Sequence, residues 1–222
     1  MTTVGFIGSG RLAAAVAALS AAAGHRVVLS DPRGLRALAD LVAELGPLAT
    51  AATGEQAAQA GDIVVVRTPL SAYPGLPAAP LAGRVVVDAC NYDLRRDGPV
   101  DDLSAGRVTS SGLLQRQLTE SRVVKGLNNI LSRHLRSLAR PRGAADRSAL
   151  PIAGDDEQAK AAVTAFLDSI GYDAVDAGAL ADSWRLEPGT PVFLSPYGPP
   201  SDETGTPAGA EKIRAALAAA RR

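Results

Sequence analysis

Two glycines near the N-terminus stand at a spacing that could hold a phosphorylated ligand. Residues 8–13 read Gly-Ser-Gly-Arg-Leu-Ala, after an apolar run at 4–8 and at the start of a stretch with helical spacing. Gly8 would allow a tight turn, Gly10 would let the backbone approach a diphosphate, and the small Ala13 would let the helix pack close to the strand. The anion would lie at the helix N-terminus, where free amides and the helix dipole favour negative charge. The same turn contains Ser9, Arg11 and Leu12.

About 20 residues after these glycines, where a dinucleotide's ribose is normally recognised, a second apolar run ends in Ser-Asp-Pro-Arg-Gly at residues 30–34. Asp31 would accept hydrogen bonds from a free 2′-hydroxyl, which would indicate NAD, or it could form a turn beside Pro32. Ser30 and Arg33 together offer several donors to a 2′-phosphate, which would indicate NADP. We favour NADP because of these donors, and the NAD alternative stays open.

Thr68 and Pro69 come directly after residues 63–67, which are expected to form a strand. They would therefore lie at the end of the sheet where such folds hold the nicotinamide half of a cofactor. Pro69 could equally serve only to stop the strand. Arg67 is unexpected in an apolar strand. It either reaches a phosphate or carboxylate of a ligand in the crevice, or extends to solvent from an edge.

Cysteine and histidine are too scarce to predict catalysis. Cys90 is the one cysteine and has no histidine near it in the sequence, so we expect a buried, inert thiol. The two histidines, His25 and His134, are expected in packing or at the surface. A single cysteine excludes an internal disulfide and a four-ligand structural zinc site, and it favours a cytoplasmic location. We therefore name no catalytic residue and no metal ligand.

The elements that would position these residues alternate between strand and helix. Fully apolar runs indicate strands of a parallel sheet covered on both faces, and apolar residues at helical spacing indicate the helices between them. Right-handed crossovers then give an α/β fold with a doubly wound parallel sheet of the Rossmann type. The strands are expected over residues 4–8, 25–30, 48–51, 62–69, 83–90 and 121–130, and the helices over 9–24, 35–45, 54–60 and 113–118.

The pattern changes after about residue 127. We expect a Rossmann dinucleotide-binding domain over residues 1–127 and a smaller C-terminal α/β unit over residues 128–222, which would serve the substrate and dimerisation. In this unit the expected elements are helices over 130–138, 155–170 and 208–222, strands over 149–154 and 172–175, and a loop over 186–207.

Composition narrows the class of partner. The chain has 222 residues, of which 46% are hydrophobic and 21% charged, as in globular proteins. Its 23 basic and 23 acidic residues cancel, so no long-range field favours nucleic acid or an anionic membrane. There is also no run of roughly 18 apolar residues that could span a bilayer. We therefore expect a small-molecule substrate, with no nucleic acid or membrane partner.

Seven segments, in order along the chain, resemble the NADP oxidoreductases that depend on the deazaflavin coenzyme F420. The resemblance runs from about Val4 to Pro188. The late segments weigh most, because a glycine fingerprint is shared by many dehydrogenases. The segments are GFIGSGRLA, AGHRVVLSDPRG, AGDIVVVRTP, GRVVVDACN, SRVVKGLNNI, PIAGDDEQAK and YDAVDAGALADSWRLEP.

The resemblance implies hydride exchange between NADPH and F420, with the two rings stacked in a cleft between the two units, and it implies a homodimer. The cofactors perform such chemistry, and the protein supplies orientation and exclusion of water. The implied roles are a phosphate turn at Gly8 to Leu12, a 2′-phosphate clamp at Ser30 and Arg33, a nicotinamide edge at Thr68 and Pro69, and a place along the cofactor cleft for Asn128.

The chain departs from the family's usual pattern near the expected cleft. The family usually has a small or apolar residue where Arg67 stands, a proline where Tyr92 stands, and AFNT at residues 126–129. These departures affect the expected identity of the hydride acceptor more than the expected binding of the dinucleotide. One alternative is a relative of β-hydroxyacid dehydrogenases or imine reductases, because Lys125 and Asn129 match the KxxxN pair of the hydroxyacid enzymes. Another is a dinucleotide-binding sensor without turnover.

Overall fold

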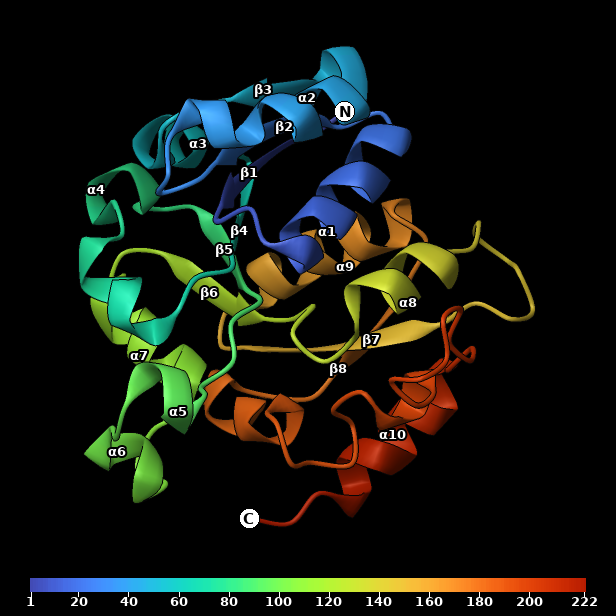
Figure 1. Ribbon diagram of the computed structural model, residues 1–222. Helices are drawn as coiled ribbons and strands as arrows, with labels where there is room; N and C mark the ends of the chain where they lie inside the picture. Colours follow the sequence, from blue (N-terminus) through green and yellow to red (C-terminus); the bar gives the residue numbers. More distant parts are fainter.

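The computed structural model describes all 222 residues, which are built around a single sheet of eight strands (Figure 1). The first six strands are parallel and lie in the order β3-β2-β1-β4-β5-β6. This is the strand order of a Rossmann sheet, and the expected fold class is confirmed. The strands are β1 Thr3–Ile7, β2 Arg26–Ser30, β3 Ala49–Ala51, β4 Ile63–Val66, β5 Val85–Asp88 and β6 Arg122–Lys125.

Two further strands extend the sheet beyond β6. β7 (Ala149–Gly154) runs antiparallel to β6, and β8 (Asp173–Asp176) runs parallel to β7. The expected boundary at 127/128 falls just after β6, so the sheet continues across it. The division into two domains remains a prediction.

Helices cover both faces of the sheet, and α1 packs against α8 in Figure 1. None of them combines the length and the apolar character that a membrane crossing requires. The α-helices are α1 Arg11–Ala22, α2 Ala39–Leu45, α3 Gly54–Ala60, α4 Ala78–Leu81, α5 Leu94–Asp97, α6 Asp101–Ser104, α7 Ser110–Gln117, α8 Ser132–Ser137, α9 Glu157–Ser169 and α10 Ala210–Ala219. The 3-10 helices are η1 Leu35–Leu38, η2 Gly46–Leu48, η3 Leu70–Gly75, η4 Leu180–Leu186 and η5 Ser195–Tyr197.

Successive side chains of the apolar strands point to opposite faces of the sheet, so the hydrophobic core has two parts, one on each face. Val65 and Val87 join a cluster of 38 buried residues that includes residues of α1, α9 and α10. Their strand neighbours Val64 and Val86 join a cluster of 14 on the opposite face, with residues of η3 and α7. Successive strand side chains point to opposite faces, so a continuous apolar run supplies both cores.

The structure adds three α-helices that the sequence pattern does not indicate: α4 between β4 and β5, and α5 and α6 between β5 and α7. Each is a single turn long, too short to show apolar periodicity. α7 also begins at Ser110, three residues before the expected start, because the Thr109 side chain caps it by accepting a hydrogen bond from the Gly112 amide.

Candidate functional site

The turn between β1 and α1 has the backbone that its glycines predict. Gly8 has φ +103°, and a Cβ there would collide with the carbonyl oxygen of Arg67. Only glycine fits this position without strain. Gly10 has φ −62°, and a Cβ there would meet nothing within 4 Å. The backbone at Gly10 therefore faces open space that a ligand could enter.

Gly10 is also the N-cap of α1, and no side chain caps the helix. The first bond of the helix runs from the Ala14 amide to the Gly10 carbonyl, at 3.0 Å. The amides of residues 11–13 consequently have no partner within the helix. Together with the helix dipole, they fit the diphosphate of a dinucleotide.

Beside this turn lies a smaller cleft of about 270 Å³. Gly8 and Ser30 line it together with Asp31 and Pro32, so it occupies the expected position of the adenosine ribose. Ser30 is 4% exposed, and its hydroxyl donates to the Phe6 carbonyl at 2.8 Å. A 2′-phosphate would receive a hydrogen bond from Ser30 only if this internal bond were released.

Asp31 is fully engaged within the protein. Its Oδ1 accepts hydrogen bonds from the Arg33 amide at 2.7 Å and Arg33 Nε at 2.9 Å. Its Oδ2 accepts from Arg33 Nη2 and from the Ser9 hydroxyl. These bonds, those of Arg33 above all, hold the pKa of Asp31 well below its ordinary value. With both oxygens occupied, Asp31 has no free acceptor for a ribose 2′-hydroxyl, which weakens the NAD alternative.

Arg33 is oriented by the same contacts but remains open to solvent. Its side chain is 73% exposed, and Asp31 engages only Nε and Nη2. The remaining N–H groups of the guanidinium are free to donate to a phosphate. Neither Arg33 nor Ser9 lines either cleft, but both are held by hydrogen bonds to Asp31, which lines the smaller one.

A larger cleft of about 490 Å³ continues from the smaller one, with Thr68 and Pro69 lining both. Besides these two, it contains four residues that the sequence predicts for the site, namely Gly10, Arg11, Leu12 and Asn128. Arg67 lines it as well, which agrees with the first of the two places that the sequence allows for this residue. The sequence pattern does not indicate the other lining residues, namely Asn91, Arg96, Ile130, Leu131, Ser132, Arg133, Phe193 and Leu194.

Two features of this larger cleft are typical of a binding site. Thr68 Oγ1 and Asn128 Oδ1 are buried and make no hydrogen bond, which is costly unless a ligand supplies a partner. Leu127, next to Asn128, and Leu194 both have positive φ, at 62° and 63°. Such strained non-glycine residues cluster at ligand sites. The amide of a nicotinamide ring could donate to either orphaned oxygen, so the residues present fit NADP.

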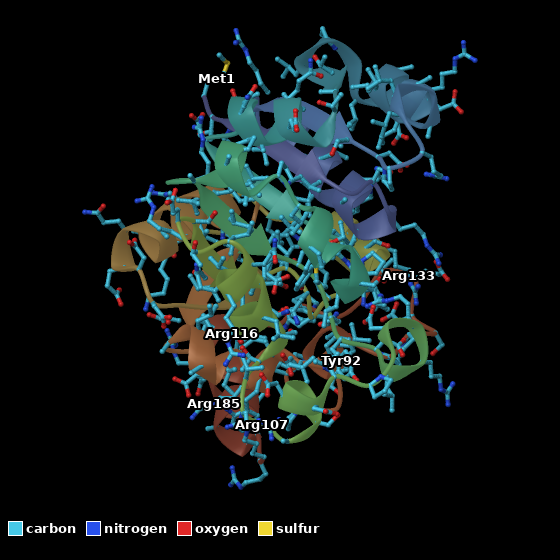
Figure 2. The ribbon with its side chains drawn as sticks, turned by 90° about the vertical axis from the view of Figure 1, so that its left-hand side faces the viewer. Met1, Tyr92, Arg107, Arg116, Arg133 and Arg185 are labelled. Carbon is cyan, nitrogen blue, oxygen red and sulfur yellow. The ribbon has the colours of Figure 1, made fainter.

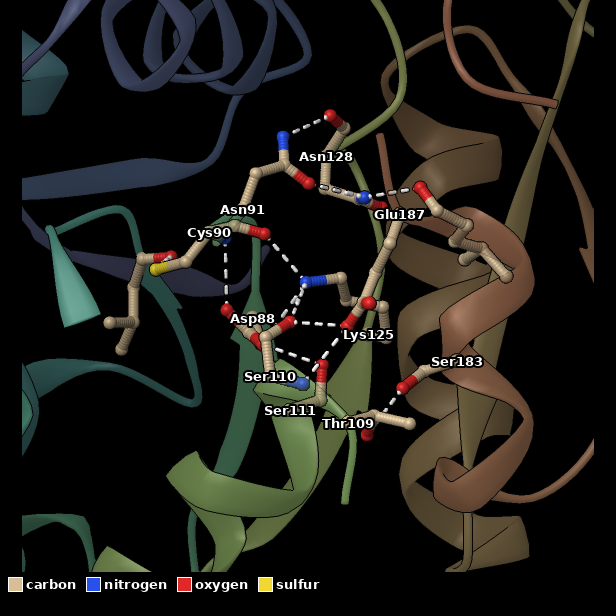
Figure 3. Close-up of polar contacts among 12 residues, drawn as sticks. Asp88, Cys90, Asn91, Thr109, Ser110, Ser111, Lys125, Asn128, Ser183 and Glu187 are labelled. Carbon is tan, nitrogen blue, oxygen red and sulfur yellow. Dashed lines mark hydrogen bonds and ion pairs between the residues drawn. The ribbon is translucent and has the colours of Figure 1, made fainter. Parts of the chain in front are cut away.

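A buried charge network lies at the carboxyl ends of β5 and β6 (Figure 3). Lys125 and Asp88 are both 0% exposed, with Lys125 Nζ 3.3 Å from Asp88 Oδ2. Lys125 Nζ also donates to the Cys90 carbonyl at 2.5 Å and to Ser110 Oγ at 3.3 Å. Asp88 accepts in addition from the Ser111 hydroxyl and the Cys90 amide. The network ties the two strands to α7.

This geometry removes Lys125 and Asn129 from the cleft. Neither lines it, and both are completely buried. Asn129 Nδ2 donates to the Val192 carbonyl at 3.1 Å and to the Tyr197 hydroxyl at 3.4 Å. The pair that suggested a hydroxyacid dehydrogenase is therefore used internally.

Cys90 and the histidines are likewise internal. Cys90 is 0% exposed, as expected, and burial together with the Asp88 charge raises the pKa of its thiol to about 12. His25 and His134 are packing residues, 8% and 1% exposed. His25 Nε2 lies 2.8 Å from Ser169 Oγ. His134 Nε2 lies 2.7 Å from the carbonyl oxygen of Asp202.

Comparison with solved structures gives proteins of similar architecture, and comparison with curated proteins gives a short sequence match. A hypothetical protein from Sinorhizobium meliloti has 26% sequence identity and a TM-score of 0.74, with 88% of this chain and 94% of that one covered. A protein from Arthrobacter sp. FB24, described as a putative F420-dependent NADP reductase, has 25% identity and a TM-score of 0.66, with 83% and 87% covered. The Escherichia coli K12 protein YjhV is 36% identical over 53 residues, which are 24% of this chain and only 39% of YjhV.

A family match covers the dinucleotide-binding turn, the lining of the smaller cleft and part of the lining of the larger one. Residues 3–92 match the family described as "NADP oxidoreductase coenzyme F420-dependent". These residues contain β1 to β5, the glycine turn, Asp31 with Arg33, and the Thr68-Pro69 edge. Over this segment, the chain is similar to the family of F420-dependent NADP oxidoreductases.

Proposed function

We propose that the protein is an NADP-dependent oxidoreductase that transfers a hydride between NADPH and a deazaflavin of the coenzyme F420 type. The observation that carries the NADP part is the combination of free amides at the start of α1 with an Asp31 that has no acceptor left for a 2′-hydroxyl. The family match over residues 3–92 and the Arthrobacter relative support the deazaflavin as acceptor.

Bound NADPH would supply the hydride, which carries two electrons to the acceptor, while water supplies any further proton. The chain's own residues bind and orient. The first turn of α1 would hold the diphosphate, Arg33 the 2′-phosphate, and Thr68 with Asn128 the nicotinamide amide. The only side chains lining the larger cleft that carry charge are arginines, which do not exchange protons at physiological pH. This suits a direct hydride transfer without a side-chain acid or base.

We extend the proposal to the assembly and location that the sequence suggests. A homodimer in the cytoplasm, acting on a small molecule, is consistent with the family resemblance and the single buried cysteine. Size-exclusion chromatography with light scattering would measure the oligomeric state directly.

The test mixes purified protein with NADPH and oxidised F420 and follows the loss of deazaflavin absorbance. We expect NADPH-dependent reduction that requires the protein. If NADPH binds in a calorimetric titration but F420 is not reduced, the deazaflavin is the wrong acceptor or the protein is a sensor. If NADPH does not bind at all, the proposed function is wrong.

The Arg33→Ala variant should lose preference for NADPH over NADH. The exposed guanidinium would donate charge-assisted hydrogen bonds to the 2′-phosphate, so we expect NADPH affinity to fall about tenfold or more. NADH affinity should be kept or should rise, because Asp31 would lose two donors and could accept from a free 2′-hydroxyl. Calorimetry with both nucleotides measures this. Arg26→Ala is the matched control, because Arg26 is also exposed but begins β2 at its opposite end. Equal losses for both nucleotides would reject Arg33 as a phosphate clamp.

A further inference from the structure

Asn91 and Asn128 form a reciprocal pair of amides in the lining of the larger cleft. They follow two paired strands, β5 and β6. Asn128 Nδ2 donates to Asn91 Oδ1 at 2.9 Å, and Asn91 Nδ2 donates to the Asn128 carbonyl oxygen at 2.9 Å (Figure 3). Asn128 Nδ2 also donates to the Leu186 carbonyl oxygen, at 2.7 Å. Both hydrogens of the Asn128 amide are therefore used within the protein.

These partners allow only one orientation of each amide. A backbone carbonyl can only accept, so Asn91 presents Nδ2 to the Asn128 carbonyl, and Asn128 presents Nδ2 to the Leu186 carbonyl. Asn128 is 3% exposed, and in this orientation its Oδ1 is buried and has no partner. An amide oxygen accepts hydrogen bonds and cannot donate them. The ionised diphosphate of a dinucleotide, which also only accepts, cannot satisfy this atom, so the missing partner is a donor.

The backbone of Asn91 is held on both sides. The carbonyl of Cys90, the preceding residue, accepts from the buried Lys125 Nζ at 2.5 Å. The carbonyl of Asn91 itself accepts from Arg96 Nη2 at 2.6 Å. The buried charge network at the ends of β5 and β6 thus reaches the cleft through Asn91 (Figure 3). Asn91 is therefore a fixed support for the Asn128 amide.

The nicotinamide end of the dinucleotide carries a matching donor. Its carboxamide has an NH2 group for Asn128 Oδ1, and the other orphaned group of the cleft, the Thr68 hydroxyl, can donate to the carboxamide oxygen. A donor to a buried, unpaired oxygen recovers part of the free energy that its burial costs. The hydroxyls of the adjoining ribose are the other donors in this half of the molecule, and the test below separates them from the carboxamide.

We infer that Asn91 is a positioning residue for the nicotinamide ring. It holds the Asn128 amide so that Oδ1 is the acceptor for the carboxamide NH2. The site then selects a pyridine ring whose C3 substituent carries an N–H donor. This inference rests on the proposed function, because it specifies how the dinucleotide of that function is recognised.

The test is calorimetric titration with NADP⁺ and with its 3-acetylpyridine analogue, in which a methyl group replaces the carboxamide NH2. We expect the native protein to bind NADP⁺ about tenfold more tightly than the analogue, which is the size of one hydrogen bond to a buried acceptor. The ribose hydroxyls are identical in the two ligands. The ratio of the two affinities therefore reports the NH2 group alone.

Asn91→Ala should lower this preference to about threefold or less. The Asn128 amide would lose one of the two acceptors that fix it, and Oδ1 would no longer be held in place. A merely structural loss would weaken both ligands equally and leave the ratio unchanged. Asn91→Asp keeps an acceptor for Asn128 Nδ2, so it should retain the preference even where the total affinity changes.

Gln115→Ala is the control for the loss of an amide side chain. Gln115 is half-buried like Asn91, and its three side-chain hydrogen bonds run to residues 118–123. Its neighbour Arg116 lies well away from Arg133, a lining residue of the larger cleft, in Figure 2. Gln115→Ala should therefore keep the tenfold preference. Thermal unfolding of each variant measures the effect on stability separately.

Equal affinity of the native protein for the two ligands would overturn the inference and leave NADP binding, and with it the proposed function, in place. A preference that Asn91→Ala leaves unchanged, or that Gln115→Ala lowers as much, would also overturn it. Failure of NADP⁺ to bind would reject the inference and the proposed function together. A preference that depends on Asn91, in a protein that does not reduce F420, would support the inference and reject the deazaflavin as acceptor.

Discussion

Replacing Lys125 with methionine is expected to lower the free energy of unfolding by about 3 to 5 kcal/mol, the usual cost of breaking a buried ion pair. The variant would leave the Asp88 carboxylate fully buried, with only the Ser111 hydroxyl and the Cys90 amide as donors. It would also leave the Cys90 carbonyl without the lysine donor. Guanidinium unfolding followed by circular dichroism measures the change.

Two further variants identify the cause of this loss. Lys212→Met removes an exposed lysine that makes one hydrogen bond, to the Pro196 carbonyl, and should cost less than about 1 kcal/mol. Asp88→Asn in the Lys125→Met background removes the isolated charge and keeps an acceptor for the Cys90 amide, so it should restore about 1 kcal/mol or more. A Lys125→Met variant as stable as Lys212→Met would contradict the buried pair.

The Gly10→Ala variant should bind NADPH about a hundredfold more weakly while remaining folded. A Cβ at Gly10 meets no protein atom within 4 Å, so the folded chain accommodates it. The methyl group would instead occupy the space where the diphosphate approaches the amides of α1, and loss of charge-assisted bonds there accounts for this magnitude. Calorimetry gives the affinity, and thermal unfolding gives the stability.

Gly209→Ala is the control for Gly10→Ala, because the two glycines occupy the same position in their helices. Gly209 is the uncapped N-cap of α10, with φ −66° and ψ 170° against −62° and 169° for Gly10. Both substitutions should change stability by a similar small amount, and only Gly10→Ala should affect NADPH. Gly8→Ala differs from both, because its positive φ and the clash with Arg67 should destabilise the fold as well. Unchanged NADPH affinity in Gly10→Ala would place the diphosphate elsewhere.

The strands and the glycine turn could be predicted because their signals are local. The apolar runs ending at Val66 and Asp88 are buried strands, and the spacing of Gly8 and Gly10 gives a turn with one positive φ and one open position. These features depend on residues within a few positions of each other. Periodicity and backbone conformation are therefore sufficient to find them.

Contacts between distant segments could not be read in this way. Asp88 and Lys125 are 37 residues apart, although each is the polar end of an apolar strand and their register makes them neighbours. That shared position is the signal that could have found the pair. Phe193 and Leu194 offer no such signal, because they come from a C-terminal loop whose path to the cleft depends on tertiary packing.

The continuity of the sheet across β6 and β7 has a consequence for attempts to isolate the nucleotide-binding half. A fragment that stops at residue 127 would turn β6 into an edge strand, with the hydrogen-bonding groups that pair Val124 and Lys125 with β7 left open. The fragment would also lack α9, whose Val163 and Phe166 belong to the main apolar core, so the apolar residues that α9 covers on the sheet would be exposed. Exposed edges of this kind template intermolecular β-pairing, so the shortened chain should self-associate into aggregates while the intact chain does not.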